Sequence, residues 1–447
     1  MERKQLEYLK EWYKKKNRKP LIIWGARQVG KSYLIEEMFL KQNFKDYVYI
    51  DLKKDDDSRA FFQTTSNPKK YLSYIEARFN KKISNSLPLA FDEVQVCHQV
   101  LTSLKYFCQD YPELPVIATG SLVRLALEKT KNSNDEPLFP VGKVNSMNMY
   151  PLTFEEYLMN ANKVLLERIK ASYQEKKPLQ EYEHELALNM LYEYLAIGGM
   201  PEVVNTFLVE KSYVDVSEIK RQIYDNYLSD MDSYNISYET VLKTRNVYNN
   251  IFAQLNKENK NFKISTVEKG KSNRDYFGAY RWLELAKVIY ISSKKDGKVT
   301  TPLISDNKGL FRIYLADSGM FTYQSRENNA NFFVKDKRNT LSGIFYENYV
   351  ACELSAKDIQ LFYWCGKNEY EFEFIVEING SIIPIDVKKK KGKLNSLVDF
   401  RNHNERTIAI KISSNNYGYD QENMILTIPL YEVFLLAEDI KNNKITV

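Results

Sequence analysis

The sequence predicts an α/β protein whose N-terminal domain is built on a parallel sheet. Short apolar runs alternate with amphipathic segments in the first third of the chain, a glycine-containing turn follows the first run, and acids follow a later one. Strands that alternate with helices form parallel sheets covered on both faces. With 447 residues, 44% of them apolar, the chain is long enough for about two to four domains.

The expected strands of the first third are PLIIWG (20–25), YVYIDL (47–52), LPLAFDE (87–93) and LPVIATGS (114–121). Between them, KSYLIEEMFLK (31–41) and HQVLTSLKYFCQDY (98–111) carry apolar residues at helical spacing. The segment VNSMNMYPL (144–152) closes this region. The first domain is therefore expected to span residues 1–152.

Three further segments are expected after this domain. Residues 153–234 read as a helical lid, interrupted by the helix stop GGMP (198–201). Residues 235–324 hold helices at 238–256 and 274–287 followed by two strand-like runs, a pattern typical of a winged-helix-like module. Residues 325–447 hold a helix, a hairpin and further strands and helices, and are expected to form an α/β domain.

The composition argues against several classes of protein. No apolar run reaches the length of about 18 residues that a membrane span needs, and the N-terminal residues are charged throughout, so a cytoplasmic protein without a signal peptide is expected. Four cysteines and three histidines are scattered without metal-ligand spacing, which predicts neither a zinc site nor a disulfide framework. The net charge of +6 permits an anionic partner without requiring one.

The segment GARQVGKS fits the phosphate-loop pattern G-x-x-x-x-G-K-[ST], with a predicted strand before it and a helix after it. Its residues are Gly25, Ala26, Arg27, Gln28, Val29, Gly30, Lys31 and Ser32. Backbone N–H groups of such a loop and the helix N-terminus form a cradle for phosphates. Lys31 can reach the β- and γ-phosphates and the Ser32 hydroxyl can ligate Mg²⁺. No local motif distinguishes ATP from GTP.

A phosphate loop needs acids on a neighbouring strand, and LPLAFDEVQ supplies Asp92 and Glu93. Asp92 is expected to hold Mg²⁺, directly or through water, and Glu93 to polarise the attacking water. Acids at a strand end are common, so this pair alone is a weak signal for a nucleotide site. Together with the phosphate loop it becomes a strong one. Thr119 or Ser121, at the end of the next strand, is placed to sense the γ-phosphate, although such a serine also serves as an ordinary helix cap.

The segment EFEFIVEINGSIIPIDVKKKK (371–391) predicts a β-hairpin, because an Asn-Gly pair separates two runs of alternating residues. With this pair as a two-residue loop, Glu373 lies opposite Asp386 and Glu371 lies opposite Lys388. The apolar residues of both runs share the other face, which is the expected core face. Facing carboxylates repel and destabilise a strand pair, and a longer loop would change the register.

The succession GARQVGKS, LAFDEVQ, VIATGS and PLTFEEYL resembles a family of bacterial and archaeal AAA-type P-loop ATPases, over essentially the whole chain. In that family a GGMPEV-like segment, here 198–203, follows in the helical part. The resemblance implies ATP as the nucleotide and hydrolysis as the reaction. A Gly-Arg pair is usual before the PLTFEEYL-like segment, but here the pair is Gly142-Lys143, and lysine lacks the bidentate fork of arginine. Arg124 is another candidate for phosphate contact, and its role is left open with that of Lys143.

The last domain of that family resembles the PD-(D/E)xK nuclease fold. The matching residues are Glu373, Asp386 and Lys388, with Glu347 as a further acid from the preceding helix. A divalent cation between Glu373 and Asp386 would turn their repulsion into shared coordination, and Lys388 would stabilise charge on a phosphate or orient water. The alternative is an ordinary solvated hairpin face whose acids are neutralised by Lys388 or Lys389. Domains of this fold can also lose activity and keep DNA binding.

The favoured function is an AAA-type ATPase that uses Mg²⁺ and ATP and is coupled to a DNA-binding, nuclease-like C-terminal domain. Duplex DNA is a partner to test because the winged-helix-like segment is basic. Its basic residues are Arg274, Arg281, Lys287, Lys294, Lys295 and Lys298. The alternatives are a nucleotide-dependent switch or scaffold with negligible turnover and an ATP-regulated, metal-dependent nuclease. Formation of a homo-oligomer is left open, because Lys143 weakens the usual argument for rings.

Overall fold

The computed structural model describes residues 1–120, 141–233, 238–305, 309–326, 335–366, 370–387 and 395–444. The chain divides into two compact units. The N-terminal unit consists of Glu2–Tyr150 and Leu285–Lys287, and the C-terminal unit of Met1, Pro151–Glu284 and Val288–Val447. Within the described ranges, no helix is both long enough and apolar enough to cross a membrane.

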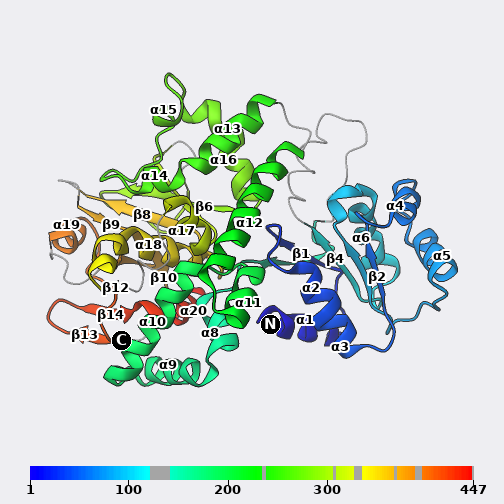
Figure 1. Cartoon of the computed structure of the whole chain (residues 1–447), viewed down its shortest axis with the longest axis horizontal. Coiled ribbons are helices and arrows are strands. Elements are labelled where there is room, and N and C mark those ends of the chain that lie inside the picture. The colour runs from blue at the N-terminus through cyan, green and yellow to red at the C-terminus, as the bar shows by residue number, and fades with distance from the viewer. Residues whose placement is uncertain are drawn as a thin grey trace. The chain divides into compact units, whose positions relative to one another are not determined.

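A five-stranded parallel sheet forms the centre of the N-terminal unit (Figure 1). Its strands are β1 (Leu21–Gly25), β2 (Val48–Asp51), β3 (Leu89–Asp92), β4 (Val116–Gly120) and β5 (Asn145–Met149). They lie in the order β2-β3-β4-β1-β5, and β1, β3 and β4 are buried at every position. Central strands of a parallel sheet are covered on both faces, which explains their continuous apolar runs. The predicted α/β class is confirmed.

Helices cover this sheet on both sides (Figure 1). They are α1 (Gln5–Lys14), α2 (Lys31–Tyr33), the π-helical η1 (Leu34–Leu40), α3 (Lys41–Asn43), α4 (Asp56–Gln63), α5 (Pro68–Phe79), the 3-10 turn η2 (Val94–Val96) and α6 (His98–Asp110). The single helix predicted over 31–41 is therefore an α-helical turn that continues as a π-helix.

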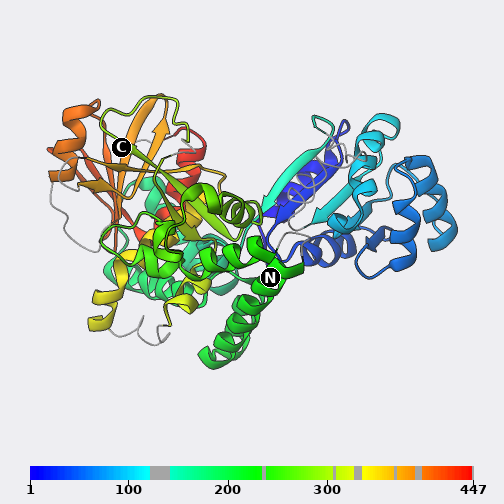
Figure 2. The ribbon, with the colours of Figure 1, turned by 90° about the horizontal axis from the view of Figure 1, so that it is seen from above.

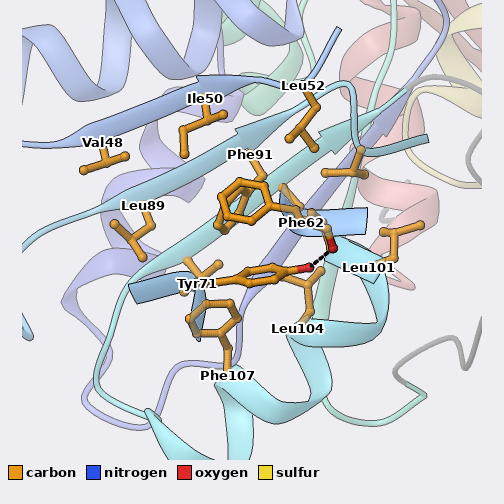
Figure 3. Close-up of a cluster of buried hydrophobic side chains, with 14 of the residues drawn as sticks. Val48, Ile50, Leu52, Phe62, Tyr71, Leu89, Phe91, Leu101, Leu104 and Phe107 are labelled. Carbon is orange, nitrogen blue, oxygen red and sulfur yellow. Dashed lines mark hydrogen bonds between the residues drawn. The ribbon is translucent and has the colours of Figure 1, made fainter. Parts of the chain in front are cut away.

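Aromatic packing between α4, α5, α6 and the sheet builds the core on one side (Figure 3). The rings of Phe62 and Phe91 meet edge to face, with centroids 5.7 Å apart. The Tyr71 hydroxyl is satisfied within the core because it donates to the carbonyl oxygen of Phe62 at 3.0 Å. This cluster anchors β3, whose carboxyl end carries the predicted acids.

The C-terminal unit begins with helices α8 (Phe154–Ala161), α9 (Lys163–Glu175), α10 (Glu181–Ile197), α11 (Pro201–Glu210) and α12 (Tyr213–Ser233). A capping box starts α8: the Thr153 hydroxyl accepts from the Glu156 N–H at 3.3 Å, and the Glu156 carboxylate accepts from the Thr153 N–H at 3.2 Å. The predicted stop at GGMP is confirmed. Gly198 has a φ of 84°, and a Cβ there would lie 2.4 Å from the Asp317 carboxylate.

A four-stranded sheet combines strands from the winged-helix-like segment and the segment after it. The helices α13 (Tyr238–Asn249), α14 (Ile251–Leu255), α15 (Ile264–Val267) and α16 (Asn273–Leu285) precede β6 (Ile289–Asp296), β7 (Phe311–Leu315) and α17 (Ser318–Ser325). β6 and β7 pair in an antiparallel manner. On its other side β6 pairs in parallel with β8, so the sheet has the order β7-β6-β8-β9.

The remaining elements are α18 (Lys335–Ser355), β8 (Leu361–Cys365), β9 (Glu371–Phe372), β10 (Phe374–Ile378), β11 (Ser381–Val387), α19 (Asn395–His403), β12 (Ala409–Ser413), β13 (Gly418–Asp420), β14 (Ile425–Pro429), η6 (Leu430–Glu432) and α20 (Val433–Lys441). Five of these strands form a second sheet, in the order β10-β11-β12-β14-β13, whose first strands are orange in Figure 2.

The predicted two-residue hairpin turn is confirmed. Asn379 and Gly380 have φ values of 50° and 77°, and Ile378 pairs with Ser381. Both residues therefore adopt the left-handed region that a tight hairpin turn requires.

The hairpin is covered on both faces, whereas the alternation predicted a single core face. Ile375 and Ile382, on the side that also carries the acids, are buried against Leu397 and Phe400 of α19. The alternation identifies one core face and does not specify what lies against the other side. Here β11 lies inside the sheet next to β12 and a helix covers the second side.

Candidate functional site

The predicted phosphate loop connects β1 to α2 in the N-terminal unit. Gly25 is the last residue of β1, and Lys31 is the first residue of α2. Between them, Gln28 and Gly30 have positive φ values of 65° and 91°, so the chain turns tightly before the helix begins. This places backbone N–H groups at a helix N-terminus, where they can bind an anion.

Close packing against β5 requires glycine at position 25. It pairs with Met149 of β5, and a Cβ at this position would lie 2.4 Å from the Met149 carbonyl oxygen. The loop between is anchored by Ala26 and Val29, which are 2% and 0% exposed. Arg27 is half-buried and Gln28 is exposed. The loop is therefore held against the sheet by its small and apolar residues.

Lys31 lies with its side chain inside the loop. It is 5% exposed, and its Nζ donates to the carbonyl oxygens of Gly25 at 3.1 Å and of Ala26 at 2.8 Å. A buried ammonium is costly unless it is hydrogen-bonded. The loop itself thus holds this positive charge at the N-terminus of α2.

Asp92, at the end of β3, is the centre of a hydrogen-bond network. Ser32 Oγ and Tyr49 Oη each donate to its Oδ2 at 2.5 Å. Its Oδ1 accepts from Thr119 Oγ1 and, at 3.0 Å, from the Glu93 backbone N–H. The structure therefore brings the predicted residues Ser32, Asp92 and Thr119 together, although they come from three different elements.

Tyr49 was not predicted as part of the site. It comes from β2, which pairs with β3. Burial and, to a smaller extent, the negative charge of Asp92 raise the pKa of its phenol. One feature of the sequence could have indicated its role. Tyr49 lies two residues before Asp51, hence on the same face of a strand that ends beside the acids. Its hydroxyl stays a hydrogen-bond donor to Asp92 at ordinary pH.

Glu93 follows directly and turns the chain away from the sheet. Its φ of 56° is left-handed, and its side chain is half-buried. Its Oε2 accepts a hydrogen bond from Gln95 Nε2, a second residue that was not predicted. Gln95 therefore orients the carboxylate that is expected to polarise water.

The residues present fit a nucleotide with Mg²⁺. Mg²⁺ prefers oxygen ligands, and the Ser32 hydroxyl and Asp92 carboxylate lie side by side. The Lys31 ammonium and the loop N–H groups suit phosphate oxygens. Of the other predicted residues, Ser121 and Arg124 lie outside the described residues, and Lys143 is exposed.

The C-terminal acids gather around two cations. Lys260 Nζ lies 2.6 Å from Glu347 Oε2, 3.4 Å from Glu371 Oε1 and 3.7 Å from Glu373 Oε1. Arg312 lies 3.2 Å from Glu347 Oε1 and 2.5 Å from Glu371 Oε2. We call these five residues the ionic cluster. Neither cation was predicted, although an arginine within the apolar run FRIYL was a signal of a buried partner.

The ionic cluster is largely buried. Arg312, Glu347 and Glu373 are 2%, 1% and 4% exposed. Burial alone would raise the pKa of Glu347, but the charges of Lys260 and Arg312 outweigh it and lower that pKa below its ordinary value. The Glu347 carboxylate is therefore ionised and paired.

The other nuclease-like candidates lie at the hairpin. Asp386 is half-buried and pairs in register with Lys411 of β12, and Lys388 lies outside the described residues. The ladder between β10 and β11 begins at Phe374, and Glu371 instead pairs with β8 at Cys365. The chain switches sheets at Glu373, so the predicted register does not extend to Glu371.

Three family models match parts of the chain. Residues 17–158 match a family model described as an AAA domain. Residues 188–331 and 342–431 match two models that are each described as a domain of unknown function, DUF8612 and DUF4143. The match to the AAA domain model thus covers most of the N-terminal unit.

Similar proteins cover most of the chain. An uncharacterized protein of Methanocaldococcus jannaschii is 24% identical over 371 residues, which are 79% of this chain and 71% of that protein. A Walker-type ATPase of Pyrococcus abyssi aligns with 72% of this chain and 95% of its own length, at 15% identity and a TM-score of 0.42. The ORC2 protein of Aeropyrum pernix aligns with 76% of this chain and 94% of its own, at 12% identity and a TM-score of 0.32.

Proposed function

We propose that the N-terminal unit binds and hydrolyses ATP with Mg²⁺ and that this cycle controls the C-terminal unit. The observation that carries the proposal is the Asp92 carboxylate, which accepts from both Ser32 of the phosphate loop and Thr119 of β4. These are the positions from which a P-loop enzyme holds Mg²⁺ and senses the terminal phosphate. The AAA domain match over residues 17–158 supports the same assignment.

Each residue has a role that its position allows. The loop N–H groups and Lys31 bind the β- and γ-phosphates, and Ser32 and Asp92 hold Mg²⁺. Bound Mg²⁺ would neutralise charge on the phosphate oxygens. Glu93 accepts the proton of the attacking water or orients that water, and Thr119 contacts the γ-phosphate through its hydroxyl. The inward position of the Lys31 ammonium means that incoming phosphate would replace the two carbonyl contacts it makes.

Duplex DNA is the partner that we propose for the C-terminal unit. Arg274 and Arg281 on α16 and Lys298 after β6 are exposed, and such side chains can contact phosphates without sequence preference. Arg281 also pairs with Glu284, which reduces the charge it offers. The segments 153–234, 235–324 and 325–447 are proposed as the lid, the winged-helix-like module and the nuclease-like domain.

The decisive experiment is ATP hydrolysis by the full chain with Mg²⁺, with and without duplex DNA. Lys31→Ala should lower turnover by at least about 100-fold, because it removes a charge that stabilises the transition state. The matched control is Lys45→Ala, an exposed lysine of the same unit, which should keep the wild-type rate. Equal turnover in wild-type and Lys31→Ala would refute the proposed site.

Glu93→Gln separates hydrolysis from a nucleotide-dependent switch. If Glu93 acts on water, this change should leave ATP bound and reduce turnover by about 100-fold or more. A switch with negligible turnover would bind ATP equally well in both forms and show no rate to lose. Stimulation of the wild-type rate by DNA would support the coupling, and a rate indifferent to DNA would argue against it.

A further inference from the structure

We infer that Lys260 and Arg312 replace a divalent metal ion in the ionic cluster. A metal-dependent nuclease would hold such an ion among acids of this kind. The C-terminal unit therefore works without a metal ion among these acids. The inference concerns this cluster alone and does not depend on whether the N-terminal unit hydrolyses ATP.

The first support is the position of the Lys260 ammonium. Its Nζ faces one oxygen from each of Glu347, Glu371 and Glu373, at 2.6, 3.4 and 3.7 Å. Divalent metal ions bind carboxylate oxygens at about 2.0–2.6 Å. Glu347 accepts a hydrogen bond from the ammonium, and the other two acids form ion pairs with it at distances longer than metal–oxygen bonds.

The second support is the use of the remaining oxygens. Glu347 Oε1 accepts from Tyr314 Oη at 2.6 Å as well as from Arg312 at 3.2 Å. Glu373 Oε2 accepts the Val387 backbone N–H at 3.0 Å. Across the described residues, no group of three or more His, Cys, Asp or Glu side chains is placed to hold a metal ion. The acids are therefore already engaged by protein donors.

The third support is the charge. One lysine and one arginine supply two positive charges, the same as one divalent ion, against the three carboxylates of the cluster. Arg312 is 2% exposed and lies over the Tyr363 ring, with its guanidinium carbon 4.2 Å from the centroid. Removing it would leave the single charge of Lys260 to compensate three carboxylates, two of them buried, which is strongly unfavourable.

The two cations and the three acids of the ionic cluster come from different segments of the chain. Lys260 precedes α15 and Arg312 lies in β7, whereas the acids come from α18, β9 and the bend before β10. The cluster therefore ties the winged-helix-like segment to the nuclease-like segment. A unit held in this way can bind a nucleic acid as one body, without metal-dependent cleavage at this position.

The test measures Mn²⁺ binding by electron paramagnetic resonance on the full chain without nucleotide. Wild-type and Glu373→Gln should bind the same amount of Mn²⁺, because the cluster takes none. Gln keeps an oxygen for the Val387 N–H, which protects the fold. Binding in the wild-type protein that is lost in Glu373→Gln would overturn the inference. So would Mn²⁺-dependent cleavage of duplex DNA that is lost in the same variant.

A second measurement tests the role of Lys260 as the internal cation. Lys260→Met removes the positive charge and should lower the melting temperature. Lys260→Arg keeps the charge and should lower the melting temperature much less. The double variant Lys260→Met/Glu373→Gln removes one charge of each sign and should melt higher than Lys260→Met alone. If the double variant melts no higher than Lys260→Met, the counter-ion role is refuted. If Lys260→Met does not fold, the Mn²⁺ comparison still decides.

Discussion

Two groups of buried acids, one in each unit, are satisfied in opposite ways. Asp92 accepts from Ser32, Tyr49 and Thr119, which are neutral hydroxyl donors, and from a backbone N–H. Glu347 instead lies between Lys260 and Arg312, which carry full charges. Neutral donors leave the negative charge of Asp92 to attract a cation, whereas the charged partners of Glu347 already neutralise it. Acidity alone therefore does not identify a metal site; the charge of the neighbours decides.

The same contrast exists within one helix. Glu347 and Glu353 both lie in α18 and are both about 1% exposed. The two cations lower the pKa of Glu347, but burial raises the pKa of Glu353 to about 8, and its hydrogen bond from the Phe154 N–H offsets this only in part.

The largest effect is expected from Arg312→Met. This change leaves Glu347 and Glu371 in the ionic cluster without their guanidinium partner, so we expect a loss of about 3–5 kcal/mol in the free energy of unfolding. The measurement is urea denaturation of the full chain. The comparison is Ser32→Ala, which removes a neutral donor and should cost far less. Equal losses in the two variants would break the contrast between charged and neutral partners.

The next effect is a pH dependence caused by Glu353. Its folded-state pKa of about 8 lies above the ordinary value of 4.5, so between these pH values the folded state binds a proton that the unfolded state has released. The stability is complete below the lower value and falls as the pH rises toward 8, by at most about 1.4 kcal/mol per pH unit. Glu353→Gln should flatten this slope.

Thermal unfolding of wild-type, Glu353→Gln and Glu347→Gln between about pH 3 and pH 8 provides the check. Glu347 supplies the internal contrast, because a lowered pKa gives stability that is present above the ordinary value and is lost as the pH falls below it. Glu347→Gln should therefore change the acid side of the profile. Parallel profiles for wild-type and Glu353→Gln would contradict the raised pKa.

The smallest effect is expected from Tyr49→Phe. It removes one of the hydroxyl donors to Asp92 and leaves the others, so we expect a loss of about 1 kcal/mol in the free energy of unfolding. If Tyr49 orients the carboxylate that we propose holds Mg²⁺, the Mg²⁺ concentration needed for half-maximal ATP hydrolysis should also shift. The control is Tyr33→Phe, an exposed tyrosine of α2, which should change neither quantity. An unchanged Mg²⁺ requirement in Tyr49→Phe would limit that residue to a structural role.

The predicted phosphate loop could be found in the sequence because its residues are contiguous. Gly25, Lys31 and Ser32 owe their positions to one strand, one turn and the start of one helix, and local spacing specifies all three. The hairpin turn at Asn379 and Gly380 was predictable for the same reason, since its left-handed φ values demand those residue types.

The partners of the acids could not be located in this way. Tyr49 reaches Asp92 from a neighbouring strand, and Lys260 reaches Glu373 across more than a hundred residues of chain. Spacing along the sequence carries no information on such contacts. The arginine in the apolar run of β7 indicates a buried partner, but neither it nor the lysine before α15 shows in the sequence which acids it meets.

The sequence by itself determined the parallel α/β sheet, the tight turn between β1 and α2 and the two-residue turn of the C-terminal hairpin, because each depends on local periodicity and backbone preference. Only the tertiary structure decided which charges meet. It surrounded Asp92 with hydroxyl groups and placed Lys260 and Arg312 against Glu347. Electrostatic energy depends on distance and burial, and both are properties of the folded chain.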